Sequence, residues 1–457
     1  MASVRPEASA KPWWEALRLP LQSAASIERL ARTLPNLERD PRFRRGEVQL
    51  SLERTAALLA ALREPLRALP VLHVAGSKGK GSVCRIASEL LVAHGLRVGT
   101  YTSPHVERWN ERIALDGAPI TTRELGRCLE AVVAAARRAR IGAPTLFEAL
   151  TAAAFVAFRR ARVDVAVVEV GIGGLLDATN VVASDVAVVT SLEREHTAIL
   201  GKSLAAIAAQ KAGIFKRGAA ALSGVPRHRA EAAVLRAKAR SVAAPLLEWG
   251  GALGLRRGAA GIAIRCGATT WGPLPPPPGG RFAARNAALA LAAVDALARR
   301  RPELGLALDH ERIAAALRRV TLPGRLEVIA ERPRTWRDGA HTPRSLRGTV
   351  ADVAEAAGCR PVLLFALKRD KPLAACLRAL ATRCGPVVAT DVPDGTGYPP
   401  KEIVAVARSL GIMARPSRSP ADGYAVARRL AGANGALLVT GSFWLAGAMP
   451  PRRRRGR

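Results

Sequence analysis

The feature that most constrains the fold is a strand, a glycine-rich turn and a helix that follow one another without a break from Val71. The apolar run VLHVAG leads into SKGKGS and then into the helical pattern VCRIASELLVAHG. Backbone N–H groups of such a loop, at the N-terminus of a helix, form a nest for phosphate oxygens. We expect Lys80 to reach the outer phosphates of a nucleotide and Ser82 to lie near its metal ion. The loop comprises Gly76, Ser77, Lys78, Gly79, Lys80, Gly81 and Ser82.

The spacing of this glycine loop differs from that of the common P-loop, because Gly81 separates the lysine from the serine. A glycine-rich turn that binds no ligand is the alternative interpretation. The loop nevertheless stands between a strand and a helix, which is the context that phosphate binding requires. We therefore predict that Lys80 and its neighbours bind a nucleotide.

Two valine-rich runs, at 163–171 and 185–192, are typical of strands that are covered on both faces of a sheet. Helical patterns rich in Ala and Leu, at 122–141 and 147–161, alternate with such strands. This alternation predicts an α/β fold with a doubly wound sheet. A chain of 457 residues has room for two or three domains.

A second series of alternating strands and helices follows the segment TLPGR at 321–325. We predict a domain boundary there, with a first domain at 1–321 and a smaller Rossmann-like α/β domain at 322–457. Within the first domain, we expect a small β-rich region at 245–280 and a long helix that begins at Asn286.

The net charge of +33 raises the question of a nucleic-acid partner, since phosphates dominate the binding of nucleic acids. Of the 70 basic residues, 10 are Lys and 60 are Arg, and they are spread along helical patterns rather than gathered with aromatic residues. No helix-turn-helix, zinc or RNA-binding aromatic signature accompanies them. The basic block at 452–455 is expected to be a solvated tail. A small anionic substrate is favoured, and a basic nucleic-acid-binding protein is the alternative.

No run of about 20 apolar residues is present, so we expect no membrane-spanning helix. The first residues lack the continuous apolar stretch of a secretory signal. The six cysteines lie far apart, without a CxxC pair or histidines at zinc spacing. Each lies in an apolar or Ala-rich segment, so we expect reduced core thiols in a cytoplasmic protein.

Charged side chains follow both valine-rich strands. Glu169 ends the first run and opens a glycine loop that leads to Asp177, and His196 follows the second run. Ligands of α/β sheets bind outside the carboxyl ends of the strands, so we expect Glu169 and His196 at the same sheet edge. A carboxylate there suits a hard cation such as Mg²⁺. A turn capped by Asp177 and a structural histidine are the alternatives.

Eight segments stand in the order that characterises one enzyme family. From about Leu50 to Gly447, the chain resembles the folylpolyglutamate synthase/dihydrofolate synthase family of Mur-type ATP-dependent amide ligases. One such segment would be a weak sign, and the common order of all eight carries the resemblance. The segments are HVAGSKGKGS (73–82), YTSPHVERWNERI (101–113), VVEVGIGGLLDATN (167–180), HTAILGKSLAAIAAQKAGI (196–214), NAALALAA (286–293), LPGRLEV (322–328), DGAHTP (338–343) and VTGSFWLAG (439–447).

The resemblance implies a reaction. With Mg²⁺ bound, ATP would phosphorylate the carboxylate of dihydropteroate or of a folate, and the amine of L-glutamate would displace phosphate to form an amide. The first domain would be a Mur-ligase-type ATPase domain that also binds folate, and the second a ligase domain. Family members are commonly monomers, so we expect a monomer. Nucleotide contacts on both domains imply a hinge closure near 315–322.

The resemblance also assigns roles to individual residues. The glycine loop would hold the triphosphate, and Lys80, Lys211 and His196 would take part in catalysis. Lys211 matches a lysine that the family carries as a carbamate, a group that supplies oxygen ligands to a second Mg²⁺. The residues matched to the first Mg²⁺ site are Ser103, Glu169 and His196. Further nucleotide contacts match Asn286, Arg325, Asp338 and His341. Positions near the pterin match Thr145, Leu176, Asp177 and Ala178.

Several motif positions depart from the family pattern. Lys78 stands where the family has Asn, and Leu175 stands where it has Arg, so the loops gain one cation and lose another. The carboxylate before His196 belongs to Glu195 rather than Asp. Further departures occur at Gln49, Ala283 and Thr342. ATP-dependent ligase chemistry is therefore better supported than folate specificity. A divergent ligase for another carboxylate and a degenerate paralogue without catalysis are the alternatives.

Overall fold

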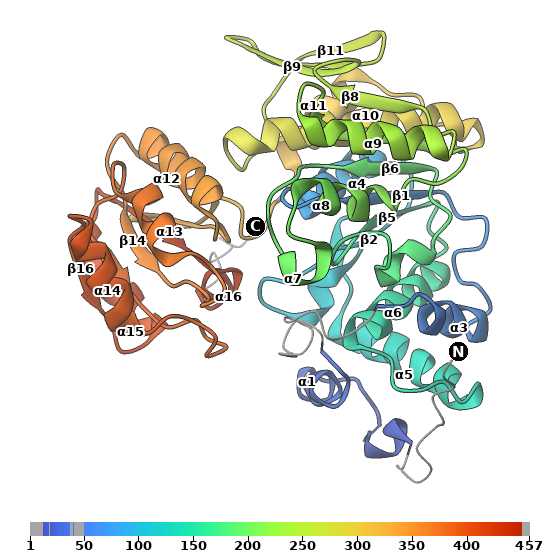
Figure 1. The fold of residues 1–457 in the computed structure, drawn as a ribbon, viewed down its shortest axis with the longest axis horizontal. Coiled ribbons are helices and arrows are strands. Elements are labelled where there is room, and N and C mark those ends of the chain that lie inside the picture. Colours follow the sequence, from blue (N-terminus) through green and yellow to red (C-terminus); the bar gives the residue numbers. More distant parts are fainter. Residues whose placement is uncertain (1–11, 18, 37–39, 41–49, 450–457) are drawn as a thin grey trace. The chain divides into compact units, whose positions relative to one another are not determined.

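The structure, a computed structural model, describes residues 12–17, 19–36, 40 and 50–449. Its contacts divide the chain into two units, and each unit is built around a sheet of its own (Figure 1). Unit 1 comprises Met1–His105, Trp109–Pro276 and Arg285–Val320. Unit 2 comprises Val106–Arg108, Pro277–Ala284 and Thr321–Arg457.

Unit 1 contains an eleven-stranded mixed sheet in the order β11-β10-β9-β8-β7-β6-β1-β5-β2-β3-β4. The strands from β2 to β8 in this order are parallel, and the two ends of the sheet carry antiparallel strands. The bounds are β1 Val71–Ala75, β2 Val98–Tyr101, β3 Ile113–Leu115, β4 Ala118–Pro119, β5 Val165–Glu169, β6 Val186–Val189, β7 Ala220–Pro226, β8 Leu246–Trp249, β9 Leu253–Gly258, β10 Gly261–Cys266 and β11 Thr269–Leu274.

Helices surround this sheet. The bounds are η1 Trp13–Ala16, α1 Ala24–Thr33, α3 Glu53–Ala61, α4 Lys80–Ala93, η2 Trp109–Arg112, α5 Thr122–Arg138, α6 Leu146–Ala161, η3 Ala178–Val181, α7 Thr197–Leu200, α8 Leu204–Ala212, α9 Ala230–Ser241, α10 Arg281–Arg300, η4 Pro302–Leu304 and α11 His310–Arg319. The valine-rich runs become β5 and β6, in which every residue is buried. The prediction of doubly covered strands in an α/β fold is confirmed.

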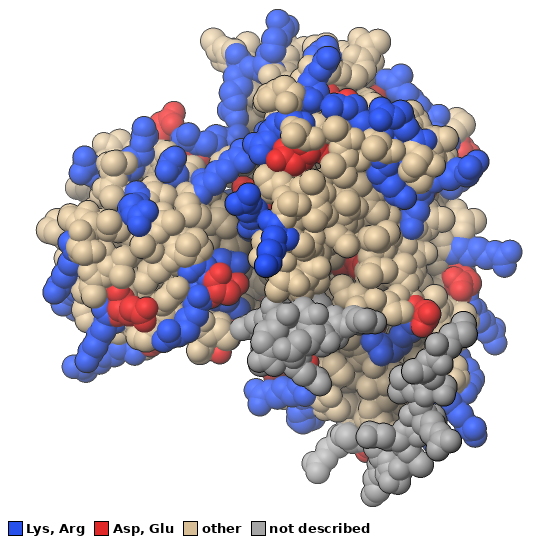
Figure 2. Space-filling view, in the orientation of Figure 1, with Lys and Arg blue, Asp and Glu red and all other residues tan. Residues whose placement is uncertain are grey.

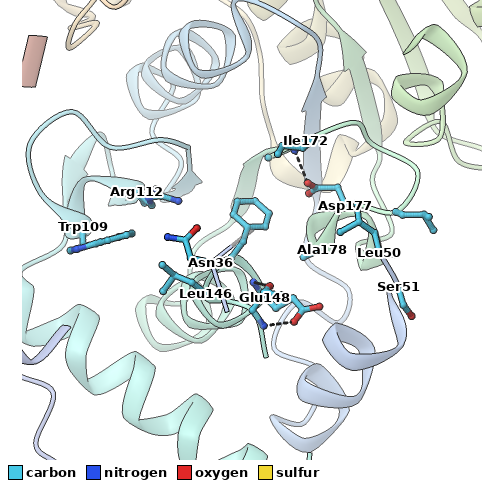
Figure 3. A pocket seen from close by; sticks show the side chains of 14 residues that line it. Asn36, Leu50, Ser51, Trp109, Arg112, Leu146, Glu148, Ile172, Asp177 and Ala178 are labelled. Carbon is cyan, nitrogen blue, oxygen red and sulfur yellow. Dashed lines mark hydrogen bonds between the residues drawn. The ribbon is translucent and has the colours of Figure 1, made fainter. Parts of the chain in front are cut away.

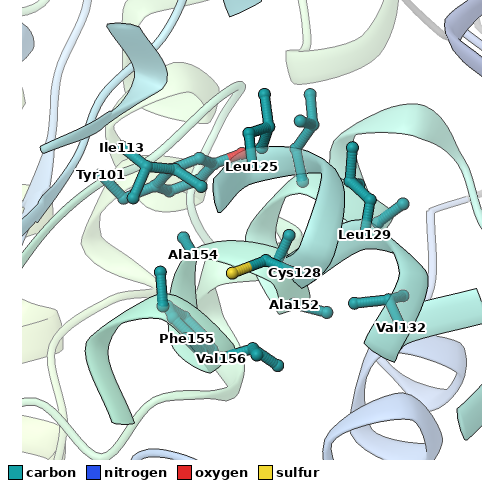
Figure 4. Close-up of a cluster of buried hydrophobic side chains, with 14 of the residues drawn as sticks. Tyr101, Ile113, Leu125, Cys128, Leu129, Val132, Ala152, Ala154, Phe155 and Val156 are labelled. Carbon is teal, nitrogen blue, oxygen red and sulfur yellow. The ribbon is translucent and has the colours of Figure 1, made fainter. Parts of the chain in front are cut away.

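Alternation along the strands explains how both faces become covered. In β5, Ala166 and Val168 contact the core that α5 and α6 form on one face. Helix α4 packs on β1, β2 and β5, and its residues Ile86 and Leu90 are completely buried outside that cluster. Figure 4 shows the side of the core where Tyr101 packs with residues of α5 and α6. Successive side chains of a strand point to opposite faces, so a run of valines fills both cores at once.

The β-rich region predicted at 245–280 is present as β8 to β11, and its last three strands form antiparallel pairs. The predicted start of the following helix at Asn286 is wrong, because α10 begins at Arg281. The Arg281 N–H donates to the carboxylate of Asp352, 3.0 Å away, and its guanidinium pairs with the same side chain at 2.6 Å. This acceptor lies 71 residues further along the chain, so local sequence patterns do not reveal it.

Unit 2 has a six-stranded sheet in the order β12-β13-β17-β14-β15-β16, parallel except for the first pair. Its strands are β12 Glu327–Glu331, β13 Arg334–Arg337, β14 Val362–Phe365, β15 Val387–Ala389, β16 Ala414–Pro416 and β17 Ala436–Thr440. Its helices are α12 Pro343–Ala357, α13 Leu373–Leu380, α14 Pro400–Ser409, α15 Pro420–Ala431 and α16 Phe443–Gly447. Two cores occupy opposite faces of this sheet, since Leu363 and Phe365 belong to one and Val362 and Leu364 to the other.

The cysteines and the charges follow the expectations with one exception. All six cysteines are free thiols, and five are buried, but Cys359 is exposed, so the prediction of a core thiol is wrong there. Cys359 lies in the loop between α12 and β14, where the chain is at the surface. Figure 2 shows Lys and Arg side chains dispersed over the visible face. Among the described residues, none of the helices combines the length and apolar character that crossing a membrane requires. The basic block 452–455 lies outside the described residues.

Close packing of β2 on α6 makes a stability prediction. A Cβ atom on Gly99 would overlap the ring of Phe158, which is completely buried. We expect Gly99→Ala to lower the free energy of unfolding of unit 1 by about 1–3 kcal/mol, because the core is overpacked. The matched control is Gly142→Ala, where no heavy atom lies within 4 Å of the added methyl group. Urea unfolding of both variants tests this, and equal stabilities would contradict it.

Candidate active site

The phosphate loop predicted from the sequence connects β1 to α4 and begins and ends at the carboxyl edge of the sheet. Gly79, with φ +88°, precedes the first helical residue, and no side chain caps the N-terminus of α4. A Cβ atom on Gly79 would lie 2.6 Å from Asn286 Oδ1, so the loop and α10 meet here with room only for glycine. The first turn of α4 therefore presents unshared N–H groups and the positive end of the helix dipole to a ligand.

Side chains that follow β6 hold the loop in place. Thr190 Oγ1 donates to the Lys78 carbonyl at 2.7 Å, and the Lys78 N–H donates to Ser191 Oγ at 2.9 Å. The Ser77 N–H donates to the Ser191 carbonyl at 2.9 Å, and the Glu193 N–H donates to Ser77 Oγ at 2.9 Å. The backbone of the loop is therefore fixed on both sides of Lys78, while the lysine side chain extends from it.

Glu169, Ser103 and Gly81 lie together at the end of β5. The buried Glu169 carboxylate accepts a hydrogen bond from the Ser103 N–H, with 2.9 Å between Oε2 and N. A Cβ atom on Gly81 would lie 3.1 Å from the same oxygen, so the start of α4 closely approaches the carboxylate. Ser82, in the same turn, is also buried. This arrangement offers the oxygen donors that a hard cation prefers, next to the phosphate loop.

Lys211, in α8, is almost completely buried and pairs with Glu195, with 3.3 Å between Nζ and Oε1. Lys78 Nζ lies 3.5 Å from the other oxygen, Oε2, of the same carboxylate. Burial lowers the pKa of Lys211 to about 8, although the Glu195 charge opposes this change. Burial alone would raise the pKa of Glu195, but Lys78, Lys211 and Lys80 together lower it to about 2. Two lysines thus share one carboxylate that stays ionised.

His196 follows Glu195 directly, at the start of α7, in a left-handed conformation with φ +48°. Its ring is exposed, and its charge is among those that lower the pKa of Glu195. Within the described residues, no group of three or more His, Cys, Asp and Glu side chains is arranged to hold a metal ion. A metal site here would have to combine Glu169 with serine oxygens, ligand phosphates or a modified Lys211.

The three predicted nucleotide contacts in the second domain, Arg325, Asp338 and His341, lie close to each other in unit 2. The Arg325 guanidinium lies 4.1 Å from the centre of the Phe443 ring, and the ring of His341 lies 6.3 Å from it. The buried Asp338 accepts hydrogen bonds from the Leu326 N–H at 2.9 Å and the Ala340 N–H at 2.8 Å. Burial raises the pKa of Asp338, which the charge of Arg325 opposes. Asp338 thereby connects the segment of Arg325 and Leu326 to the segment of Ala340 and His341.

A pocket opens in unit 1 beside the Glu169 loop (Figure 3). Its lining mixes aromatic and aliphatic side chains with a few polar ones, which suits a flat heteroaromatic ligand with polar edges. All four residues matched to the pterin region, Thr145, Leu176, Asp177 and Ala178, contribute to it. The remaining lining residues are Asn36, Leu50, Ser51, Trp109, Arg112, Leu146, Phe147, Glu148, Gly171 and Ile172.

The polar groups of the pocket are held by ion pairs and backbone donors. Glu148 caps α6 by accepting from the Thr145 N–H at 2.7 Å and pairs with Arg54 at 2.7 Å. Arg112 donates to His105 Nδ1 at 3.0 Å and lies 5.0 Å from the centre of the Trp109 ring. Figure 3 shows Trp109 and Arg112 on one side of the pocket, and Asp177 and Ala178 on the other.

Asp177 shapes the glycine loop between Glu169 and η3. It accepts hydrogen bonds from the Ile172 N–H at 2.9 Å and from the N–H and hydroxyl of Thr179 at 3.0 and 2.5 Å. Burial raises the pKa of Asp177, and these hydrogen bonds oppose the change. The capping role that was the alternative for Asp177 is present, and the residue also lines the pocket.

Sequence reasoning did not single out Trp109, Arg112 or Glu148 as pocket residues, or Glu195 as the carboxylate that joins two lysines. Trp109 and Arg112 stand in the matched segment 101–113, and Glu148 is recognisable only as the third residue of a capping box with Thr145. Their contribution depends on Arg54 and His105, which are distant in sequence or on another loop.

The positions that depart from the family pattern have different surroundings. Leu175 is 42% exposed, and its N–H donates to the Gln210 carbonyl, so no cation occupies this place. Thr342 caps α12 together with Ser345, which is a structural role. Ala283 is buried in the first turn of α10. Gln49 lies outside the described residues.

Comparison with known proteins first identifies the class. Residues 74–243 match the Mur ligase middle domain. The chain is 37% identical over 336 residues to the dihydrofolate synthase/folylpolyglutamate synthase of Mycobacterium tuberculosis, a region that covers 66% of each chain. It is 32% identical over 345 residues to the enzyme of the same name from Bacillus subtilis, which covers 73% of this chain and 79% of the relative.

Solved structures agree with these relatives over almost the full chain. The structure described as Escherichia coli FolC in complex with DHPP and ADP matches with a TM-score of 0.82 and 29% identity, over 94% of this chain and 97% of that one. The Mycobacterium tuberculosis folylpolyglutamate synthase complexed with ADP and AMPPCP matches with a TM-score of 0.82 and 30% identity, over 94% and 99%. The chain belongs to the dihydrofolate synthase/folylpolyglutamate synthase family.

The close approach of Gly79 to Asn286 makes a prediction about nucleotide binding. Gly79→Ala adds a methyl group to a residue with positive φ and against the Asn286 side chain, so the loop must move. We expect ADP affinity to fall by roughly tenfold or more, which corresponds to about 1.4 kcal/mol. Gly95→Ala is the matched control, since Gly95 has φ +90° but no heavy atom within 4 Å. Isothermal titration calorimetry measures the ADP affinity of both variants. An equal loss of affinity in the two would contradict the prediction, because backbone strain alone would then account for the loss.

Proposed function

We propose that this chain is an ATP-dependent ligase that joins L-glutamate to dihydropteroate, to a folate, or to both, with release of ADP and phosphate. One observation carries the proposal. This chain belongs to the family, and its unit 1 combines a glycine loop before an uncapped helix, a buried Lys–Glu pair and a pocket of mixed polarity. A triphosphate, a phosphoryl-transfer site and an aromatic carboxylate substrate each have a place there.

The phosphate loop binds the triphosphate of ATP. The unshared N–H groups at the start of α4 donate hydrogen bonds to phosphate oxygens, and the helix dipole favours the negative charge of the phosphates. Lys80 begins α4 and Lys78 lies two residues before it, so both ammonium groups stand beside the phosphates. In unit 2, Arg325, Asp338 and His341 are the proposed further contacts to the nucleotide.

Glu169, with Ser103 and His196, is the proposed Mg²⁺ site. The buried carboxylate and the adjacent serines are hard oxygen donors, and the fit rests on this donor set. Bound Mg²⁺ neutralises phosphate charge and polarises the phosphoryl group. Lys211 is the proposed carbamylated residue. Its lowered pKa of about 8 provides a fraction of the neutral amine that carbamylation needs.

The residues of the chain mainly position the reacting groups. Lys78 and Lys80 lie near the place where the transferred phosphoryl group carries its charge, so their ammonium groups stabilise that charge without reorganising. The substrate carboxylate accepts the γ-phosphoryl group, and ADP leaves. The amine of L-glutamate then attacks the acyl carbon, phosphate leaves with the C–O electrons, and the amide remains after the amine loses a proton.

The pocket is proposed to hold the pterin end of the substrate. Trp109 and Phe147 offer faces for a flat ring, and Thr145 and Asp177 border its polar edges. The pocket lies next to the loop that Glu169 opens, so a substrate that fills it extends its carboxylate towards the phosphate loop. Leu175 stands where the family has an arginine, so an anionic group of the substrate that this arginine would contact must bind to other residues.

We further propose a monomer without nucleic acid as its main partner. The arginines are dispersed and not gathered into one surface. This distribution favours a general positive field, which attracts ATP, glutamate and folates, and argues against a dedicated surface for a polyanion. The free cysteines are in keeping with a reducing compartment such as the cytoplasm.

Substrate dependence of phosphate release tests the function directly. The full chain, ATP and Mg²⁺ are assayed with L-glutamate and either dihydropteroate or tetrahydrofolate. We expect at least one pterin to stimulate phosphate release only when glutamate is present, because the acyl phosphate needs its amine acceptor. Omission of glutamate and omission of each pterin are the controls. No stimulation by either pterin would remove the folate assignment and favour a ligase for another carboxylate.

Lys211 gives the second test. We expect Lys211→Ala to lower kcat by roughly a hundredfold or more, because a residue of the metal site is lost. The circular dichroism spectrum should stay the same, and Lys211→Met, which keeps the aliphatic stem, should be equally inactive. The matched control is Lys202→Ala, since Lys202 is an exposed lysine of the same unit. Activity of Lys211→Ala near that of the control would exclude Lys211 from the site.

A further inference from the structure

A completely buried histidine, His73, stands in the middle of the otherwise apolar strand β1. Alternation along the strand places its side chain on the same face as Val71 and Ala75, which belong to two separate hydrophobic cores. His73 therefore introduces a polar group between these cores. Burial, with a further contribution from the charge of Lys216, lowers the pKa of His73 to about 3, so its imidazole is neutral near pH 7.

The imidazole is the first member of a chain of hydrogen bonds that ends at the pocket. His73 Nε2 lies 2.9 Å from the hydroxyl oxygen of Thr179, a residue that is also completely buried. The Thr179 hydroxyl in turn donates to Asp177 Oδ1 at 2.5 Å. Asp177 lines the pocket, and Figure 3 shows its carboxylate at the N–H of Ile172. The chain of hydrogen bonds thus connects a central strand to a side chain of the pocket.

The order of donors and acceptors determines the tautomer of His73. A hydroxyl group has one hydrogen, and Asp177 accepts the hydrogen of Thr179. The Thr179 oxygen then accepts from the imidazole, so His73 carries its proton on Nε2. Nδ1 remains an acceptor that has no hydrogen-bond partner among the described residues. Burying two polar nitrogens costs free energy that an aliphatic residue avoids, so packing of the strand does not explain why this residue is a histidine.

The same contacts determine how Asp177 faces the pocket. Its Oδ1 accepts from the N–H and the hydroxyl of Thr179, and its Oδ2 accepts from the Ile172 N–H. A carboxylate has about four lone-pair positions, so these donors leave one position, which is on Oδ2. The three donors stabilise the negative charge that burial disfavours, and they keep Asp177 as an acceptor. An N–H group at the edge of a heteroaromatic ring is a matching donor.

We propose that His73 is a positioning residue for substrate recognition, which holds the Thr179 hydroxyl on Asp177 and thereby keeps Asp177 Oδ2 available to an N–H donor of the substrate ring. The hydrogen bond from His73 makes the Thr179 hydroxyl a stronger donor, because each bond in such a chain polarises the next. The inference rests on the proposed function, since it takes a pterin as the ligand of the pocket. It adds His73 and Thr179, neither of which lines the pocket.

Substitutions of His73 separate its N–H donor from its bulk. The full chain is titrated calorimetrically with dihydropteroate and with tetrahydrofolate in the presence of ADP, and the pterin that binds the native chain is the probe. We expect His73→Leu to weaken binding of the probe about tenfold, because a hydrogen bond that supports a charged group is lost. His73→Gln should retain most of the affinity, since its amide N–H can replace Nε2–H. Native affinity of His73→Leu, or an equal loss in both variants, would overturn the proposal.

ADP binding is the control for disturbance of β1, because the phosphate loop follows this strand directly. ADP titrated into each His73 variant should bind with native affinity, since the chain of hydrogen bonds leads to Asp177 and not to the loop. A loss of ADP affinity as large as the loss of pterin affinity would show that the whole strand is disturbed. That result would overturn the role assigned to His73.

Thr179→Val breaks the chain of hydrogen bonds at its middle with little change in size, and it tests the chain even if His73→Leu does not fold. We expect a loss of pterin affinity similar to that of His73→Leu, and little further loss when the two substitutions are combined. The matched control is Thr55→Val in α3, since Thr55 is equally buried and its hydroxyl has no hydrogen-bond partner among the described residues. Fully additive losses would contradict a chain that acts as a unit.

The tautomer is tested without any ligand. Nitrogen NMR of the chain with its seven histidines isotope-labelled distinguishes protonated from unprotonated ring nitrogens. We expect the signals that disappear in His73→Gln to show a neutral ring with its proton on Nε2. A proton on Nδ1 would overturn the inference while leaving the proposed function intact. Absence of binding of both pterins by the native chain would refute the proposed function and the inference with it, so the two failures are distinguishable.

Discussion

The site depends on the position of β1 between β5 and β6. In the parallel pairing, Val74 lies opposite Glu169, and Ala75 lies opposite Val189. The chain therefore leaves β1 for the glycine loop at the place where β5 presents its carboxylate and β6 passes into the segment that holds the loop. Buried strands fix this register, because a shift by one residue would turn every side chain towards the other face.

Charge then determines what this edge can bind. The helix N-terminus of α4 and the lysines at positions 78, 80 and 211 are positive, and Glu169 and Glu195 are placed among them. A buried lysine next to one shared carboxylate is costly to maintain by itself, since each charge has lost its water. The cluster is therefore a poor source of stability, which is consistent with the phosphate site that we propose there.

The pocket beside this edge is built differently, from residues that each depend on a distant partner. Glu148 is held by Arg54, and Arg112 by His105, so the polar groups face the cavity in fixed orientations. At Leu175 and Leu176 the same region exposes two large apolar side chains. Departures from the family pattern occur on both sides, at Lys78 and Glu195 beside the phosphate loop and at Leu175 beside the pocket.

The sequence alone determined the α/β fold, the doubly covered strands and the glycine-rich loop between β1 and α4, because these follow from local periodicity and from glycine at positions with special backbone geometry. The sequence also contains the family motifs in the family's order. Only the tertiary structure decided that Glu195 joins Lys78 to Lys211, that α10 starts at Arg281, and that Trp109, Arg112 and Glu148 enclose a pocket. Each of these features depends on a partner that folding brings near. Periodicity can be recognised from neighbouring residues in the sequence, but the tertiary surroundings of a side chain cannot.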